Sequence, residues 1–388
     1  ILIILFFNGC THMIVNNDNI KQHINQDHDN SIKKEIDKIS KNLINTENNI
    51  GLVVAVLHNK KTDIYTYGYA NKNKKIPMNA NTIFALGSNS KMLISSLALI
   101  LENKKIIKLD EKISDILPKS IKYKDIDVKN ITLRNLMLHS SNLPREPYDF
   151  KTFSSMIGYF FSGENIYSHI DTKYMYKYLE DLEIKKLDLK KARYSNIGSG
   201  LLAYLLTQKT NKSLEELMTK YIYEPLNLKN TTFILPKDNE QLAVGHVGDL
   251  PLFIKANTPL ENWQFSDMMI GTGGAYSSAN DLIKIAKAHL LLSSTYLDDI
   301  LKKSHKIYTH DEELAYTLGW QVKVFKNTQI HYKYGVIAGF STYIGMNVKT
   351  KDAVIVLKNN FNWKDYIGHN TLLKLDQSSF IKDLDSPK

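Results

Sequence analysis

The fold of these 388 residues is constrained most by β-rich runs at both ends of the chain with a helical middle between them. Near the N-terminus, residues 51–58 and 62–70 flank Asn59-Lys60-Lys61, a pattern typical of a hairpin. Further strands are predicted at 318–324, 329–333, 342–346 and 353–357. Helical apolar spacing instead marks 93–101, 133–138, 200–208, 214–222 and 279–291. We therefore predict an α/β fold of the α+β type, with one antiparallel sheet built from both chain ends, flanked by helices and interrupted by a mostly helical lobe.

The same pattern divides the chain into predicted parts. Residues 31–120 and 265–388 are predicted to form the α/β lobe, and residues 121–264 the helical lobe. Residues 11–30 are polar, carry no period and are predicted to be a flexible tether. We expect a binding site in the cleft between the two lobes.

Charge makes nucleic acid a partner to consider. The net charge is +10, from 50 Lys and Arg against 40 Asp and Glu. The basic residues are scattered among acids, without a basic stripe, zinc-finger spacing or an RNA-binding signature. We therefore expect a solvated, Lys-rich surface and no nucleic-acid partner.

The single cysteine, Cys10, lies in a segment with the features of an export signal. Residues 1–7 form an apolar run too short to span a bilayer, and Asn8-Gly9-Cys10 follows. This resembles the end of a bacterial lipoprotein signal, in which the cysteine becomes the lipidated N-terminus. We interpret residues 1–10 as a signal remnant and predict lipidation at Cys10, which makes the protein an exported, membrane-anchored component of the cell envelope, periplasmic or surface-exposed. The alternative is a chance cysteine in an irregular chain end.

The strongest chemical motif is Ser88-Asn89-Ser90-Lys91, followed by an apolar helical run. If Ser88 opens that helix, Lys91 lies one turn further on the same face, where its amine reaches the Ser88 hydroxyl. A serine hydroxyl becomes a strong nucleophile only when a base takes its proton, and a lysine does so only if burial or a second cation lowers its pKa. Ser-x-x-Lys alone is weak evidence, because Ser31-Ile32-Lys33-Lys34 has the same spacing and is explained by a helix cap.

Two further motifs follow in the chain. Tyr194-Ser195-Asn196 places a phenol, which can relay protons, beside an amide that can donate to a substrate carbonyl. Lys333-Tyr334-Gly335 falls on a predicted strand, where the cation can bind a substrate carboxylate and the glycine lets a substrate backbone approach closely.

The order of these motifs resembles that of the serine β-lactamase and penicillin-binding-protein superfamily, which carries Ser-x-x-Lys, a Ser- or Tyr-x-Asn loop and a Lys-Thr-Gly strand. The tyrosine form resembles class C β-lactamases and the related D-alanyl-D-alanine carboxypeptidases and esterases. Flanking segments also resemble the family, at 109–113, 131–136, 139–144, 224–228 and 273–278. The resemblance implies a β-lactamase/transpeptidase-like fold.

The resemblance also implies a role for each site residue. Ser88 would be acylated, while Lys91 and Tyr194 handle protons. Asn196, Lys333, Tyr334 and Gly335 would bind substrate, and the backbone N–H groups of Ser88 and Val336 would form the oxyanion hole. The resemblance implies no metal and no organic cofactor.

Two positions depart from the family pattern. Tyr334 replaces the usual Thr, so a bulky ring stands where a small hydroxyl helps to hold a substrate carboxylate. Asn142 replaces a usual Gly, and we expect only a local effect because Asn tolerates left-handed backbone. His139 is interpreted as structural.

Three hypotheses about function remain open. The first is a serine hydrolase that acts through an acyl-enzyme on a β-lactam or a D-Ala-terminated cell-wall peptide. The second is an esterase or amidase for small substrates, favoured by Tyr334. The third is a surface-anchored binding protein that keeps the fold without turnover.

Overall fold

A computed structural model describes residues 32–34, 36–41, 51–184, 190–325, 328–361 and 367–376. The predicted signal remnant, the predicted tether and Cys10 lie outside the described residues. Within them, no helix is long and apolar enough to cross a membrane.

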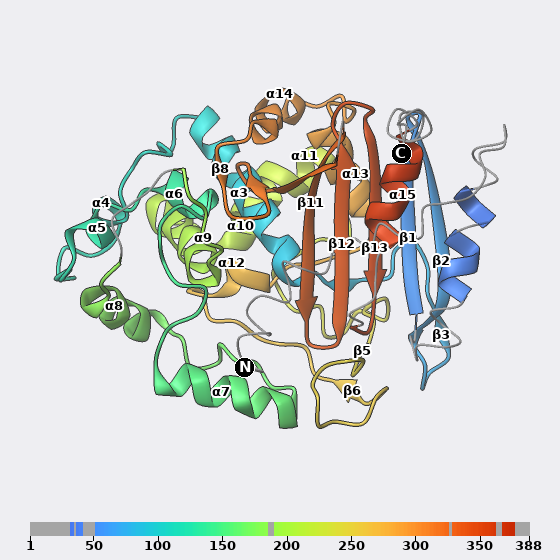
Figure 1. The fold of residues 1–388 in the computed structure, drawn as a ribbon, viewed down its shortest axis with the longest axis horizontal. Coiled ribbons are helices and arrows are strands. Elements are labelled where there is room, and N and C mark those ends of the chain that lie inside the picture. Colours follow the sequence, from blue (N-terminus) through green and yellow to red (C-terminus); the bar gives the residue numbers. More distant parts are fainter. Residues whose placement is uncertain are drawn as a thin grey trace, which may run out of the picture.

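The centre of the fold is a nine-stranded antiparallel sheet in the order β3-β2-β1-β13-β12-β11-β10-β9-β8, with β4-β7 and β5-β6 forming two small ladders (Figure 1). The strands are β1 (Gly51–His58), β2 (Lys61–Asn71), β3 (Ile76–Pro77), β4 (Phe84–Ala85), β5 (Gly245–His246), β6 (Pro259–Leu260), β7 (Tyr276–Ser277), β8 (Thr309–His310), β9 (Ala315–Tyr316), β10 (Gln321–Phe325), β11 (Thr328–Ile337), β12 (Phe340–Asn347) and β13 (Asp352–Lys358).

The two chain ends meet in this sheet because β1 pairs with β13, in a register that sets Ala55 opposite Ile355. The predicted fold class is confirmed. Every second residue of β1 belongs to a different core: Val53 and Ala55 pack in the larger one, and Leu52 and Val54 in the smaller one. A strand buried on both faces is apolar throughout, which explains the continuous run in the sequence.

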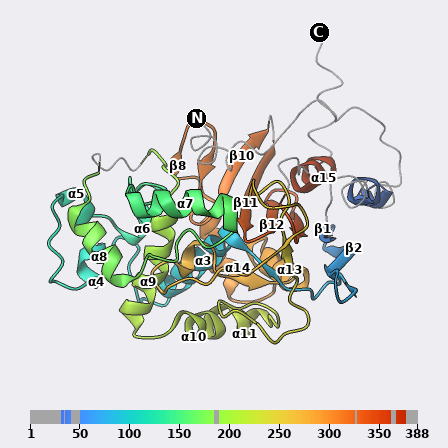
Figure 2. The ribbon, with the colours of Figure 1, turned by 90° about the horizontal axis from the view of Figure 1, so that it is seen from below.

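Helices cover the two faces of the sheet unequally (Figure 2). Helix α15 (Ile367–Leu375) and the helical residues around Ile36 cover the smaller core. Helices α3 (Ser90–Asn103) and α13 (Ala279–His289) lie on the opposite face and continue into the larger core. The remaining helical segments are η2 (Gly87–Asn89), α4 (Ile113–Ile116), α5 (Ile126–Lys129), α6 (Leu133–Met137), α7 (Phe150–Ser162), α8 (Thr172–Asp181), α9 (Asn196–Thr210), α10 (Leu214–Met218), η3 (Thr219–Tyr223), α11 (Glu224–Leu226), α12 (Ile270–Gly273), α14 (Leu297–Leu301) and η4 (Lys302–His305).

Several boundaries differ from the prediction for local reasons. The strand predicted from residue 318 begins at Gln321, because Gly319 turns the chain with φ of +108°. The helix predicted over 214–222 ends as α10 at Met218 and continues as the π-helical turn η3. Helices α7, α8 and α15 were not predicted. Helix α7 buries Met156 and Tyr159 on one side while exposing Phe150 and Phe161 on the other, so apolar residues occupy both of its faces.

Candidate active site

Ser88 stands in the turn η2, which runs directly into α3. The preceding Gly87 has φ of +52°, and a Cβ there would lie 2.9 Å from the backbone nitrogen of Val336. Strand β10 pairs with β11 only as far as Tyr332, so the segment 333–337 is an open edge on that side. The backbone around Ser88 therefore packs against this edge, close to the Val336 N–H.

Gly335 makes this approach possible. A Cβ on Gly335 would stand 2.0 Å from the Leu86 carbonyl oxygen and 2.7 Å from Thr342 Oγ1. The space that a Gly335 Cβ would fill is taken by the protein's own backbone, and the predicted role of Gly335 in binding substrate stays a prediction. Gly335 holds β11 against the turn that carries Ser88.

Lys91 lies one helical turn beyond Ser88 and is only 3% exposed. Its Nζ donates to Ser88 Oγ at 2.8 Å and to the Thr272 carbonyl at 2.6 Å. The second bond fixes the long side chain, which loses much conformational freedom on burial. The amine is thus held at the nucleophile's oxygen.

Tyr194 stands just before α9, with its ring surrounded by positive charge. Lys91 Nζ, Lys333 Nζ and Arg145 Cζ lie 5.3, 5.2 and 4.9 Å from the ring centroid. Such distances are those of cation–π contacts. Three cations in a partly buried site stabilise any negative charge that develops among them.

Lys333 is 1% exposed, and burial lowers its pKa from 10.5 to about 7. Within the described part of the chain, the pocket around Ser88 is lined by Tyr334 and Val336 but not by Lys333. Lys333 therefore contacts the ring of Tyr194, which lines the pocket, but does not line the pocket itself.

His139 supports this arrangement from beneath Tyr194. Its ring stacks on Tyr194 with centroids 4.4 Å apart, and its Nδ1 accepts the Ser195 N–H at 3.1 Å. Burial, followed by the charges of Lys333, Lys91 and Arg145, lowers the His139 pKa well below its usual value, so the ring is neutral and can accept. This agrees with the structural interpretation of His139. Asn142 has φ of +55°, as its tolerance for left-handed backbone allows.

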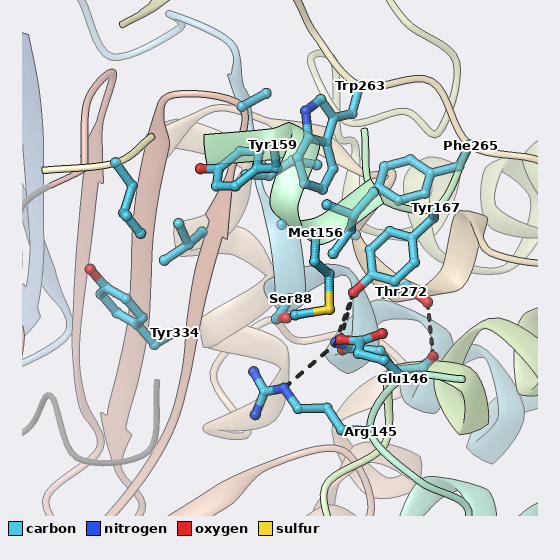
Figure 3. Close-up of a pocket in the computed structure, with 18 of the residues that line it drawn as sticks. Ser88, Arg145, Glu146, Met156, Tyr159, Tyr167, Trp263, Phe265, Thr272 and Tyr334 are labelled. Carbon is cyan, nitrogen blue, oxygen red and sulfur yellow. Dashed lines mark hydrogen bonds and ion pairs between the residues drawn. The ribbon is translucent and has the colours of Figure 1, made fainter. Parts of the chain in front are cut away.

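The pocket in front of Ser88 has one strongly aromatic side (Figure 3). Tyr159 and Met156 come from α7, Tyr167 from the loop after it, and Trp263 and Phe265 from the loop before α12. Trp263 meets Tyr159, Tyr167 and Phe265 with ring centroids 5.7, 6.2 and 6.4 Å apart. Tyr334 lies across the pocket from this group in Figure 3. Arranged in this way, the site can attack a carbonyl carbon whose substituent is apolar.

The family model described as Beta-lactamase matches residues 36–377 of this chain. The chain belongs to the beta-lactamase family. A beta-lactamase of Providencia stuartii is 30% identical over 210 residues, which are 54% of this chain and 49% of that protein. The D-alanyl-D-alanine-carboxypeptidase/endopeptidase AmpH of Escherichia coli K12 is 24% identical over 241 residues, 62% of this chain and 57% of that protein. The matches thus span about half the length of these relatives.

A solved class C beta lactamase from Rhodobacter sphaeroides has the same fold as this beta-lactamase family member. The two superpose with a TM-score of 0.72 at 19% identity, covering 92% of this chain and all 100% of the other. At this identity the likeness shows the fold.

Asn196, the first residue of α9, takes part in a closed hydrogen-bond triangle in this family member. Its Nδ2 donates to Glu146 Oε1 at 2.5 Å and to the Tyr167 hydroxyl at 2.9 Å. Tyr167 in turn donates to Glu146 Oε1 at 2.9 Å, and burial raises its pKa well above the usual value, so the phenol keeps its proton. Burial also raises the pKa of Glu146, against the charge of Arg145 and the two hydrogen bonds.

Sequence reasoning missed Arg145 and Glu146, and it missed the aromatic side of the pocket that Tyr159, Tyr167, Trp263 and Phe265 form. Arg145 and Glu146 directly follow the 139–144 segment that resembles the family. Two adjacent charged residues at that position were the signal that could have identified them as site residues. The ring of Trp263 gave no signal, because a lone Trp in a loop fits many roles. The structure brings Ser88, Tyr194, Asn196 and Tyr334 to one pocket. Lys91 contacts Ser88 from outside the pocket lining, and Lys333 is buried behind Tyr194.

Proposed function

We propose that this protein is a serine hydrolase that forms an acyl-enzyme on Ser88. The observation that carries the proposal is the 2.8 Å contact between Lys91 Nζ and Ser88 Oγ, at a pocket that Tyr194 also lines. A nucleophile within hydrogen-bond reach of a base is the arrangement that acyl transfer requires.

In the proposed reaction, the Lys91 and Tyr194 pair removes the Ser88 proton as Oγ forms a bond to the substrate's carbonyl carbon. The carbonyl oxygen becomes an oxyanion, for which the N–H groups of Ser88 and Val336 are the proposed donors. Each such donor contributes about 3 kcal/mol to transition-state stabilisation. The tetrahedral carbon then releases the leaving nitrogen or oxygen, which takes the proton. Water attacks the Ser88 ester in the second half, giving a free acid and restoring the hydroxyl.

The proposed substrates are β-lactams or cell-wall peptides ending in D-Ala. Support comes from family membership and from relatives named beta-lactamase and D-alanyl-D-alanine-carboxypeptidase/endopeptidase. The cations Lys91, Arg145 and Lys333 around Tyr194 also favour a substrate that carries negative charge.

An esterase or amidase for small substrates is the second candidate. It is favoured by Tyr334 on the pocket wall and by the position of Lys333 behind Tyr194. Both features weaken the case for a dedicated carboxylate site, because position 334 carries a ring in place of a small hydroxyl and Lys333 does not line the pocket.

Incubation with a fluorescent penicillin, a D-Ala-D-Ala peptide and simple nitrophenyl esters tests these candidates, with Ser88→Ala as the control. We expect a covalent adduct or turnover that Ser88→Ala abolishes. Esters with and without a free carboxylate, compared by kcat/KM, separate the first candidate from the second. Binding of a cell-wall ligand without any turnover, unchanged in Ser88→Ala, would replace both with a non-catalytic binding protein.

We also propose that the protein is an exported lipoprotein of the cell envelope, lipidated at Cys10, with the tether of residues 11–30 joining the anchor to the enzyme. The support is the apolar run ending in Asn8-Gly9-Cys10. Metabolic labelling with an alkyne fatty acid in a bacterial host should mark the wild type and leave Cys10→Ser unlabelled. Equal labelling of the two would refute the anchor.

A further inference from the structure

Helix α7 carries a row of exposed apolar side chains on its outer side. The row consists of Phe150, Phe153, Ile157 and Phe161, and Phe150 alone is 83% exposed. Spaced three, four and four positions apart, they fall within an arc of about 80° and follow one another over about 16 Å. The inner side of the helix is buried, and its Met156 and Tyr159 line the pocket. Single exposed apolar residues are ordinary, whereas a continuous row marks an interaction surface.

The loop between β5 and β6 extends this row. Phe253 is 64% exposed and stacks on Phe161, with ring centroids 4.5 Å apart and an angle of 16° between the rings. Its N–H donates to the Phe160 carbonyl at 3.0 Å, which ties the loop to the end of α7. Leu252 beside it is also exposed. We call the row on α7 together with Leu252 and Phe253 the α7 face; the helix and the loop lie along one edge of the molecule in Figure 1.

The segments that carry the α7 face are basic. Residues 150–162 and 250–258 contain the exposed Lys151 and Lys255 and no acid. The nearest acids along the chain stand beyond the two ends of α7, where Asp149 caps the helix and Glu164 follows it. Phenylalanine side chains flanked by lysines are typical of helices that lie in a membrane interface. With a net charge of +10 on the whole chain, this arrangement favours an anionic surface.

We propose that the α7 face docks on the surface of an anionic lipid bilayer, with its apolar side chains inserted between the headgroups. A bilayer is the partner that the proposed anchor at Cys10 brings close, because the proposed tether of residues 11–30 spans at most about 70 Å. A tethered domain occupies even a weak docking site for much of the time. Docking would leave only α7 between the pocket and the headgroups, a distance of about 10 Å. The inference goes beyond the proposed function and does not depend on turnover at Ser88.

A fluorescent label on the α7 face tests the proposal. Cys10 is the only cysteine, so the full chain with Cys10→Ser and Phe153→Cys takes one nitrobenzoxadiazole label, at position 153. Vesicles of phosphatidylcholine and phosphatidylglycerol should shift its emission to the blue, and brominated lipid should quench it. The same label at Asp299→Cys, on α14 at the opposite edge of the molecule in Figure 1, should show neither effect. Because the label reports only its own surroundings, binding of the apolar residues 1–7 to a vesicle would not produce this difference.

Two results would overturn the proposal. One is a label at position 153 that stays in water while the protein floats with the vesicles. The other is a blue shift that needs no vesicles and grows with protein concentration, which would assign the α7 face to a second copy of the chain.

Paired substitutions assign the docking to its residues. Phe150→Ser with Ile157→Ser removes two side chains beside the label, and the lipid concentration at half of the shift should rise about 100-fold. Ile126→Ser with Ile234→Ser removes two side chains from other surfaces, each 62% exposed, and should leave it unchanged. All four positions are exposed, so the melting temperatures should match that of the unsubstituted chain. Equal effects of the two pairs would contradict the assignment.

Vesicles of phosphatidylcholine alone test the part played by Lys151 and Lys255. Without anionic headgroups the lipid concentration at half of the shift should rise about tenfold. The same concentration for both kinds of vesicle would refute the anionic bilayer as the partner.

Discussion

Replacing Lys333 with methionine should make the protein more stable and less active. Lys333 is a buried cation in β11 that contacts the Tyr194 ring, and methionine fills a similar volume without charge. Burying a charge costs free energy, so this lysine is retained at the expense of stability if it serves the site.

The magnitude follows from the pKa of Lys333, which is lowered from 10.5 to about 7 by burial. That displacement is equivalent to about 5 kcal/mol of unfolding free energy. Below pH 7 the lysine is protonated in both the folded and the unfolded protein, so burial of its charge lowers the unfolding free energy by the full amount. Between pH 7 and 10.5 only the unfolded chain binds the proton, so this loss of stability becomes smaller as pH rises. Losing the cation–π contact costs about 2 kcal/mol. Lys333→Met should therefore raise the unfolding free energy by about 3 kcal/mol at low pH.

Urea unfolding of wild type and Lys333→Met at about pH 6.5 and about pH 9.5 measures this difference. We expect the variant's advantage near pH 6.5 to shrink by several kcal/mol near pH 9.5, with acylation of Ser88 slowed throughout. The exposed Lys129→Met should show neither effect. A variant that is less stable at both pH values, or an advantage that does not change with pH, would refute the reasoning.

Two further substitutions probe the site. Tyr194→Phe keeps the ring contacts with His139 and the three cations, so the melting temperature should change little. Acylation of Ser88 should slow by about 100- to 10,000-fold, because the phenol that relays the proton is gone. An unchanged acylation rate would show that Tyr194 does not transfer the proton. Gly335→Ala puts a Cβ 2.0 Å from the Leu86 carbonyl and should lower the unfolding free energy by about 2 kcal/mol or more and slow acylation, as seen by urea unfolding and an ester assay. Gly158→Ala in α7 meets nothing within 4 Å and should be neutral or stabilising, so equal losses in both variants would contradict this account.

Local signals explain what could be predicted from the sequence. The β1–β2 hairpin was predicted within a residue or two because Asn59 and Lys60 form a tight turn, both with positive φ, between apolar runs. The contact between Ser88 and Lys91 follows from helix geometry over one turn and needs no tertiary information. The pairing of β1 with β13 was expected because the strands at the two chain ends need partners to complete one sheet.

What was missed depends on contacts between distant segments. The burial of Glu146 depends on Asn196, 50 positions further along the chain, and on Tyr167. The position of Lys333 behind Tyr194 depends on how β11 meets the start of α9, which no local pattern reports. Helix α7 had a capping signal in Asp149, but its apolar residues point both inward and outward. The split into an α/β lobe and a helical lobe at residues 120 and 265 remains a prediction.

Mapping the acylated residue is the most direct test of the central claim. A slowly released acyl group, supplied as a penicillin or an activated ester, is trapped by acid quench, and the digested protein is analysed by mass spectrometry. We predict one added acyl mass, on the peptide that contains Ser88. An acyl mass on another residue with Ser88 unmodified, or substrate turnover that persists in Ser88→Ala, would contradict it.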